Sequence, residues 1–131
     1  IKYTVRVILT LDTLEYAKMS GRVKTLQAAL ASVLNVKPIA VLRQGDLNMT
    51  ERVRTRKASL DRVIEIAKEE YGDKPVYLAV VHARDLKSGQ ALLDDAKKHF
   101  NHKETMISEL SISIAANLGP GTVGLILYPI E

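Results

Sequence analysis

The sequence predicts an α/β fold, a mixed sheet of about six strands with helices packed on its faces. Three observations lead to this prediction. The chain opens with an alternating apolar pattern, it carries two segments with helical periodicity, and a strand-like run follows each of them. Its 131 residues are enough for one domain with a single hydrophobic core.

The first part of the chain predicts a strand followed by two helices. Residues 3–11 largely alternate apolar and polar side chains, which is typical of a strand. Asp12 or Thr13 is expected to cap a short helix that ends at Lys18. A second helix is expected from 25 to 34, with apolar or small residues nearly all round. The apolar surface of this helix could be shielded from water by the chain's own sheet, by a second domain or by an acyl chain.

The middle of the chain predicts a hairpin and a long helix. Pro38 opens a strand that ends at Leu42, and Gln44-Gly45-Asp46 is expected to turn the chain into a second strand over 47–53. Thr55 is the expected cap of a helix that ends at Tyr71. Its apolar stripe at helical spacing consists of Leu60, Val63, Ile64, Ala67 and Tyr71.

The last part predicts a strand, a crossover helix and two further strands. Residues 76–81 are apolar throughout, which predicts a central strand buried on both faces. Asp85 should cap a helix to about residue 100, and a strand over 104–110 should pair in parallel with the first. We expect the inward side chains of this helix to be Leu86, Leu93, Ala96 and Phe100. The final strand is expected over 122–128.

The Gly119-Pro120-Gly121 sequence predicts a rigid, tight turn before the final strand. A turn without bulky side chains can expose backbone N–H groups, which suits a carboxylate or a phosphate. The alternative is a purely structural turn between a helix and a strand.

Composition and charge exclude several classes of protein. The net charge of +4 is mild and aromatic residues are few, which is unlike most nucleic-acid binders. The densest basic cluster consists of Arg52, Arg54, Arg56 and Lys57. It could bind a phosphate or carboxylate, or it could be a solvated sheet edge that is protected by charge. Arg22 allows the same two interpretations. The chain has no cysteine, which is compatible with a cytoplasmic location.

The histidines give no clear sign of a metal or catalytic site. His82 follows a buried strand at its carboxyl end, where α/β folds tend to place ligands, but a core-edge histidine is also expected there. His99 and His102 lie near a helix terminus, and the helix dipole there explains their presence without a ligand role. We find no metal-ligand spacing and no nucleotide-binding loop, so we expect no cofactor.

Five motifs, in order, resemble the carboxy-terminal lobe of the DegV family of bacterial fatty-acid-binding proteins. The resemblance covers essentially the whole chain. The motifs are Asp12-Thr13-Leu14-Glu15-Tyr16 with Ser20-Gly21-Arg22, Leu34-Asn35-Val36-Lys37-Pro38-Ile39, Arg52-Val53-Arg54-Thr55-Arg56-Lys57-Ala58, Val80-Val81-His82-Ala83, and Asn117-Leu118-Gly119-Pro120-Gly121. Because the chain begins inside a strand pattern, we also expect it to be part of a longer polypeptide.

The resemblance implies one lobe of a two-lobed protein that encloses a long-chain fatty acid between its lobes. It implies a carrier rather than an enzyme, which presents the carboxylate to a separate fatty acid kinase. Arg22, Arg54, Asn117, Gly119 and Gly121 are then expected at the carboxylate or acyl-phosphate end. An isolated lobe is expected to expose an apolar face and to dimerise over it, and transient membrane contact is compatible with this role.

One motif departs from the family pattern. The family has Thr-His-Thr before Gly-Pro-Gly, whereas this chain has Ala116, Asn117 and Leu118. An amide donates a hydrogen bond but does not become cationic. This makes coupling to a kinase a weaker expectation than lipid binding.

Two other functions stay open at this point. Likeness to dihydroxyacetone kinase domains suggests an enzyme lobe that binds a small phosphorylated substrate through Arg22, Arg54 and the glycine turn. The cluster from Arg52 to Lys57 suggests nucleic-acid binding, which would make retention on DNA or RNA depend on salt.

Overall fold

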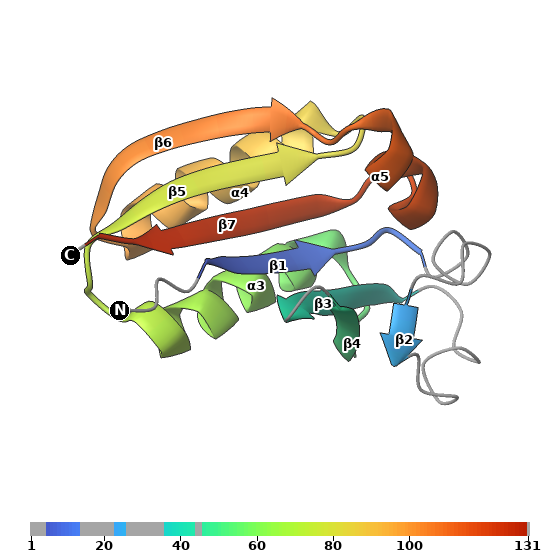
Figure 1. The fold of residues 1–131 in the computed structure, drawn as a ribbon, viewed down its shortest axis with the longest axis horizontal. Coiled ribbons are helices and arrows are strands. Elements are labelled where there is room, and N and C mark those ends of the chain that lie inside the picture. Colours follow the sequence, from blue (N-terminus) through green and yellow to red (C-terminus); the bar gives the residue numbers. More distant parts are fainter. Residues whose placement is uncertain (1–4, 14–22, 26–35, 44–45, 131) are drawn as a thin grey trace.

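The computed structural model describes residues 5–13, 23–25, 36–43 and 46–130, and these form a sheet of seven strands with helices packed against it (Figure 1). In chain order the elements are β1 (Arg6–Thr10), β2 (Val23–Thr25), β3 (Lys37–Arg43), β4 (Asp46–Val53), α3 (Arg56–Tyr71), β5 (Val76–His82), α4 (Leu86–His99), β6 (His102–Glu109), α5 (Ile112–Leu118) and β7 (Val123–Pro129).

The sheet is mixed, as predicted, with the strand order β2-β4-β3-β1-β7-β5-β6. β1 lies in the middle and pairs antiparallel with β3 on one side and β7 on the other. β3 and β4 form the predicted hairpin, with Arg43 opposite Asp46. β5 and β6 pair in parallel, as the crossover through α4 requires. These pairings confirm the predicted fold class.

The predicted cap positions define both long helices. The hydroxyl of Thr55 accepts a hydrogen bond from the Ala58 amide at 3.1 Å, and the Asp85 carboxylate accepts one from the Ser88 amide at 3.1 Å. Gly72 ends α3 with φ of 54°, a left-handed conformation that glycine adopts without strain. Local sequence therefore sets where α3 and α4 begin.

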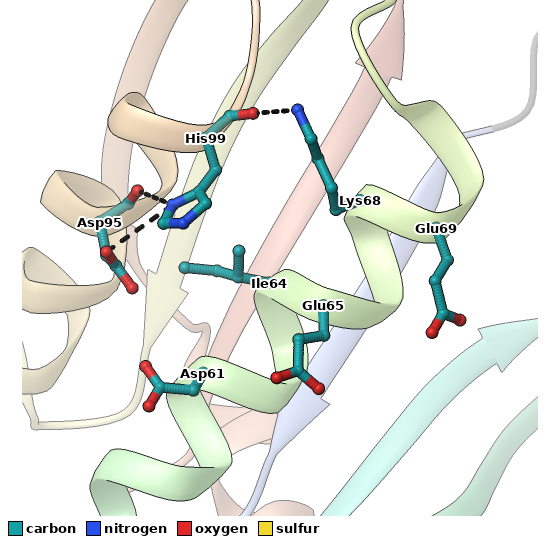
Figure 2. A pocket seen from close by; sticks show the side chains of 7 residues that line it. All are labelled: Asp61, Ile64, Glu65, Lys68, Glu69, Asp95 and His99. Carbon is teal, nitrogen blue, oxygen red and sulfur yellow. Dashed lines mark hydrogen bonds and ion pairs between the residues drawn. The ribbon is translucent and has the colours of Figure 1, made fainter.

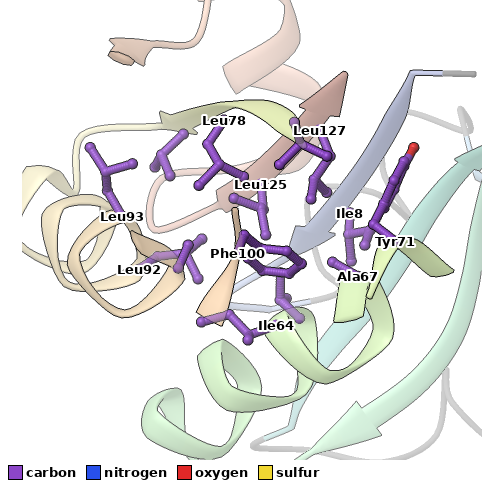
Figure 3. Close-up of a cluster of buried hydrophobic side chains, with 14 of the residues drawn as sticks. Ile8, Ile64, Ala67, Tyr71, Leu78, Leu92, Leu93, Phe100, Leu125 and Leu127 are labelled. Carbon is purple, nitrogen blue, oxygen red and sulfur yellow. The ribbon is translucent and has the colours of Figure 1, made fainter. Parts of the chain in front are cut away.

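The main core lies between the sheet and the two long helices, which cover one face of the sheet (Figures 1 and 3). Phe100 and Tyr71 lie at the ends of the helices, and Figure 3 shows their rings among aliphatic side chains from the strands. Other buried members include Ile8, Val63, Leu78, Leu92, Leu125 and Leu127. The prediction for Leu86 is wrong: this first residue of α4 is 58% exposed, because the inward positions begin at Gly89.

The structure differs from the prediction at Thr25. This residue ends β2 rather than beginning a helix, and β2 pairs in parallel with β4. A strand of only three residues has no periodicity of its own, so pairing with its neighbour decides its conformation. The remainder of the helix expected over 25–34, and the short helix expected to end at Lys18, lie outside the described residues.

The prediction that β5 is buried on both faces is also wrong. Its residues that face α3 and α4, such as Leu78 and Val80, are buried, whereas Tyr77 on the opposite face is 41% exposed. An apolar composition shows that a strand can be buried on both sides, but burial also needs a second layer. Over this end of the sheet, the described helices supply only one layer (Figure 1).

The opposite face of the sheet carries a second, smaller apolar cluster. It contains Leu9, Leu11, Ala40, Met49 and Leu118, and it lies at the end of the sheet where α5 joins β7. Burial on this face therefore falls from this end toward Tyr77. None of the helices among the described residues is both long and apolar enough to cross a membrane.

Tyr71 closes the main core at the end of α3 and is only 5% exposed. Its burial raises the pKa of the phenol to about 12, and the Glu70 carboxylate adds to this, while Arg6 opposes it. Arg6 forms an ion pair with Glu70 and so joins the start of β1 to the last turn of α3.

We expect the free energy of unfolding to fall as pH rises from about 10 to about 12. The unfolded phenol ionises near pH 10 and the folded one near about 12, so the folded state holds this proton more tightly. The loss should be on the order of 1 kcal/mol. Urea unfolding of the parent and of Tyr71→Phe, at about pH 9 and about pH 11, measures it. Equal pH dependence in the two proteins would contradict the assignment to Tyr71.

Candidate functional site

The turn at Gly119-Pro120-Gly121 joins α5 to β7 at the end of the sheet where β1 and β5 finish. Gly119 and Gly121 have φ values of 94° and 88°, which L side chains rarely adopt. The hydroxyl of the buried Thr122 donates to the Gly119 carbonyl at 2.9 Å and closes the turn. The predicted rigid turn is therefore present.

The amides of this turn are engaged within the chain. The Gly119 N–H donates to the Ala115 carbonyl at 2.7 Å, and the Gly121 N–H donates to the Ala83 carbonyl at 2.8 Å. The Ala83 N–H in turn donates to the Thr122 carbonyl at 2.8 Å. The expectation that these two glycines present unused N–H groups to a ligand is therefore wrong. The turn instead contributes a rigid surface free of side chains.

Three charged side chains from distant parts of the chain meet beside this turn. Lys37 Nζ lies 2.8 Å from Asp12 Oδ1, and Arg56 Nη2 lies 3.5 Å from the same oxygen. Arg56 Nη2 also donates to the Gly121 carbonyl at 2.5 Å. Two cations around one carboxylate leave a local excess of positive charge. We call Asp12, Lys37, Arg56 and Gly121 the turn cluster.

Arg56 has donor capacity that the described part of the chain does not use. Its Nη1 atom is buried, and no described acceptor lies within hydrogen-bond distance. A buried donor without a partner costs about 1–3 kcal/mol, so an acceptor at this position would be stabilising. The guanidinium fork is suited to a carboxylate or phosphate oxygen.

Gly121 is required by space as well as by conformation. A Cβ atom at this position would lie 2.8 Å from the Asp12 Cβ and 3.6 Å from Arg56 Nη2. Side chains do not tolerate such a contact with Asp12 without movement. The close approach therefore fixes the turn against the end of β1.

The residues predicted for the site are only partly brought together. Gly119 and Gly121 form the turn, and Asn117 lies in α5 directly before it, although its side chain is outside what the structure describes. Arg54 follows the end of β4 and is exposed, and its guanidinium makes no hydrogen bond or ion pair within the described residues. Arg22 lies outside the described residues.

Sequence reasoning missed the roles of Asp12, Lys37 and Arg56. Asp12 was expected to be a helix cap, and Arg56 was grouped with its basic neighbours. In the structure Arg56 turns toward Gly121, whereas Arg52, Arg54 and Lys57 are exposed. This separation weakens the interpretation of 52–57 as one basic surface. The position of Arg56 directly after a helix cap was the one local signal available.

His82 and His102 make structural contacts. His82 is buried, its Nδ1 accepts a hydrogen bond from the Asp85 amide at 3.1 Å, and its ring lies against Gly89. His102 Nδ1 lies 3.2 Å from the Phe100 carbonyl oxygen. Within the described ranges there is no cluster of three or more His, Asp or Glu side chains that could hold a metal ion.

A groove of about 510 Å³ lies between α3 and α4 (Figure 2). Ile64 lies at its base, and the rest of its lining is charged or polar. Figure 2 shows Lys68 donating to the His99 carbonyl and the His99 ring beside Asp95. These groups are paired with one another, which is typical of a solvated groove between helices. It gives no support for a ligand site.

Comparison with known proteins identifies relatives along the whole chain. The family model described as "Uncharacterised protein, DegV family" matches residues 1–129. A DegV domain-containing protein of Streptomyces coelicolor is 34% identical over 117 residues, 88% of this chain and 42% of the relative. One of Halalkalibacterium halodurans is 30% identical over 129 residues, 98% of this chain and 46% of the relative.

Solved structures share the fold. A DegV family protein from Thermus thermophilus is 27% identical, with a TM-score of 0.86 over 98% of this chain and 46% of that chain. One from Streptococcus agalactiae is 26% identical, with a TM-score of 0.84 over 97% of this chain and 45% of that chain. Both of those proteins are described as fatty-acid-binding. The chain spans less than half the length of the relatives it matches.

We expect Gly121→Ala to cost about 2–3 kcal/mol of unfolding free energy, from a strained φ and the contact with Asp12. Gly72→Ala is the matched control, because Gly72 also has a positive φ but has no atom within 4 Å of an added Cβ. Backbone strain alone should lower the unfolding free energy of the Gly72→Ala protein by about 1 kcal/mol. Urea denaturation measures both. Equal losses would show that the close approach to Asp12 is unimportant.

Proposed function

Because the chain belongs to the DegV family, we propose that it is one lobe of a protein that binds a long-chain fatty acid. The fatty-acid-binding descriptions of the Thermus and Streptococcus relatives support this proposal. The single observation in this chain that carries it is the juxtaposition of a cationic cluster and a largely apolar sheet face. The turn cluster lies at the end of the sheet from which that face extends.

The turn cluster suits the carboxylate end of the lipid. Lys37 and Arg56 outnumber Asp12, and the buried Nη1 of Arg56 is an unused donor within the described chain. Gly121 keeps the turn free of side chains beside them. We therefore place the carboxylate near Gly119, Gly121 and Asn117, with Arg22 and Arg54 as further cations at the same end.

The apolar face suits the tail. Enclosing a long hydrocarbon removes several hundred Å² from water at roughly 25 cal/mol per Å², so burial can supply most of the affinity. A few polar groups then fix the orientation of the ligand. The uncharged segment over 25–34 remains our prediction for one wall of the site, although it lies outside the described residues.

The second part of the proposal is that the whole protein is a carrier and not the catalyst. A separate kinase would transfer a phosphoryl group to the carboxylate of the bound fatty acid. Arg54 supports this role because its exposed guanidinium is unpaired within the described chain and stands two residues before Arg56 of the turn cluster. An enzyme lobe for a small phosphorylated substrate is less well supported, because the turn amides that would hold a phosphate donate within the chain.

Lipid binding is tested on the full-length protein. Native mass spectrometry after expression in a bacterial host should show an added fatty acid, and palmitate should raise the melting temperature by several degrees. A long-chain amine with the same tail is the control, and its cationic head should make it stabilise much less. A spectrum without ligand, and no thermal shift with palmitate, would contradict the proposal. Tighter binding of a phosphorylated metabolite would favour the enzyme alternative.

Kinase coupling is tested with a pair of neighbouring arginines. In the full-length protein, Arg54→Ala should lower the rate of acyl phosphate formation by a fatty acid kinase about tenfold, because a rim cation is lost from the encounter surface. The fatty acid content should not change. Arg52→Ala removes another exposed cation, from β4, and should leave the rate within about twofold. Equal effects of the two substitutions would indicate only general attraction by positive charge.

A further inference from the structure

The loop between β5 and α4 is short and holds one residue in an unusual backbone conformation. β5 ends at His82 and α4 begins at Leu86, at the end of the sheet where the turn cluster lies (Figure 1). Arg84, in the middle of this loop, has φ of 55°. A side chain makes this left-handed conformation unfavourable, because its Cβ crowds the following carbonyl oxygen. Such a conformation persists only where the surrounding contacts hold it.

Hydrogen bonds hold the loop on both sides of this strained residue. On one side, the Ala83 N–H donates to the Thr122 carbonyl and the Ala83 carbonyl accepts from the Gly121 N–H, both at 2.8 Å. On the other side, the Asp85 N–H donates to His82 Nδ1 at 3.1 Å. The first two bonds attach the loop to the turn, and the last one attaches it to an imidazole ring.

The imidazole of His82 is itself closely packed. His82 is 8% exposed, and its side chain lies between β5 and α4, where Gly89 leaves room for it. A Cβ atom at Gly89 would lie 3.4 Å from the His82 Cβ and 3.5 Å from its Cδ2. Such packing limits how far the ring can move. Because Nδ1 accepts a hydrogen bond, the ring is the neutral tautomer with its proton on Nε2.

The loop in turn supports the turn cluster. Gly121 has both of its backbone polar groups engaged: its N–H donates to Ala83 of the loop, and its carbonyl accepts from Arg56 Nη2 at 2.5 Å. A displacement of Ala83 would therefore move Gly121 and, through its carbonyl, the guanidinium of Arg56. Contacts run without a gap from the His82 ring to the cation that we place beside the carboxylate of the ligand.

We infer that His82 is a positioning residue for the turn cluster. Its Nδ1 holds the Asp85 amide, this bond keeps the loop in its strained conformation, and the loop holds Gly121 where Arg56 can meet a carboxylate. The effect on the ligand rests on the proposed function, whereas the effect on the turn itself does not. This role requires an acceptor at the position of Nδ1, and the volume of the ring is secondary.

A role in packing alone makes a different prediction. If His82 only filled space between β5 and α4, an apolar side chain of similar size would serve as well. A positioning role instead requires an acceptor, because a partly buried N–H that loses its partner destabilises the conformation that leaves it unpaired. Asparagine places its Oδ1 close to the position of the histidine Nδ1 and keeps the acceptor, whereas leucine fills the space and removes it.

The test uses the delipidated full-length protein, first alone and then with palmitate. His82→Leu should speed hydrogen exchange at the Gly121 amide about tenfold, because the loop that accepts this N–H is released. It should also weaken palmitate binding about tenfold in isothermal titration calorimetry, because Arg56 loses its fixed position. His82→Asn should stay within about threefold of the parent in both measurements, since the acceptor is retained.

His102→Leu is the matched control. His102 Nδ1 lies 3.2 Å from the Phe100 carbonyl oxygen, and this residue begins β6 at the opposite end of the sheet from the turn cluster. The substitution should leave Gly121 exchange and palmitate binding unchanged. A loss as large as that of His82→Leu would show that any histidine replacement disturbs the turn, and the inference would be wrong.

NMR of the nitrogen-labelled parent gives an independent check, because it shows which imidazole nitrogen of His82 carries the proton. A proton on Nδ1 would overturn the inference whether or not the variants fold. So would unchanged Gly121 exchange in His82→Leu, or equal losses in the leucine and asparagine variants. If the parent binds no palmitate, the proposed function fails, and the exchange measurements still decide the role of His82.

Discussion

The sheet has two apolar faces, and the described helices cover only one of them over most of its length. β1 shows this constraint most directly, because Ile8 faces α3 whereas its neighbour Leu9 faces the opposite side of the sheet. A central strand with apolar residues on both sides is stable only when both sides are shielded from water. The turn cluster matters because it lies at the end of the less covered face. The ligand location that we propose therefore follows from which surface the described helices leave without a cover.

The elements that were predicted correctly are those with local signals. α3 and α4 each carry a cap, at Thr55 and Asp85, and a stripe of apolar residues at helical spacing. The parallel pairing of β5 and β6 followed from the helix between them. β2 was missed because three residues carry no pattern, and the exposure of Tyr77 was missed because composition does not show whether a second layer exists. Both outcomes depend on tertiary contacts.

The site was predictable only in part for a similar reason. The Gly119–Gly121 turn is contiguous in sequence, so its conformation could be read directly. Asp12, Lys37 and Arg56 come from separate segments and meet only because β1, β3 and α3 have their ends at one place. Neither spacing nor charge distinguishes Arg56 from Arg54. The difference is that Arg56 occupies the first position of α3 and is thereby directed toward the turn.

The two long helices have a common direction, and this has an electrostatic consequence. α3 ends where β5 begins and α4 begins where β5 ends, so their first turns lie side by side, and Arg56 and Ser88 line one groove. Each helix amino terminus carries a partial positive charge of roughly half an elementary charge. Both dipoles therefore direct their positive ends toward the same end of the sheet as Lys37 and Arg56. The amphiphile with a negative head that we propose as ligand would approach a field that orients it before any side chain touches it, and this field weakens as ionic strength rises.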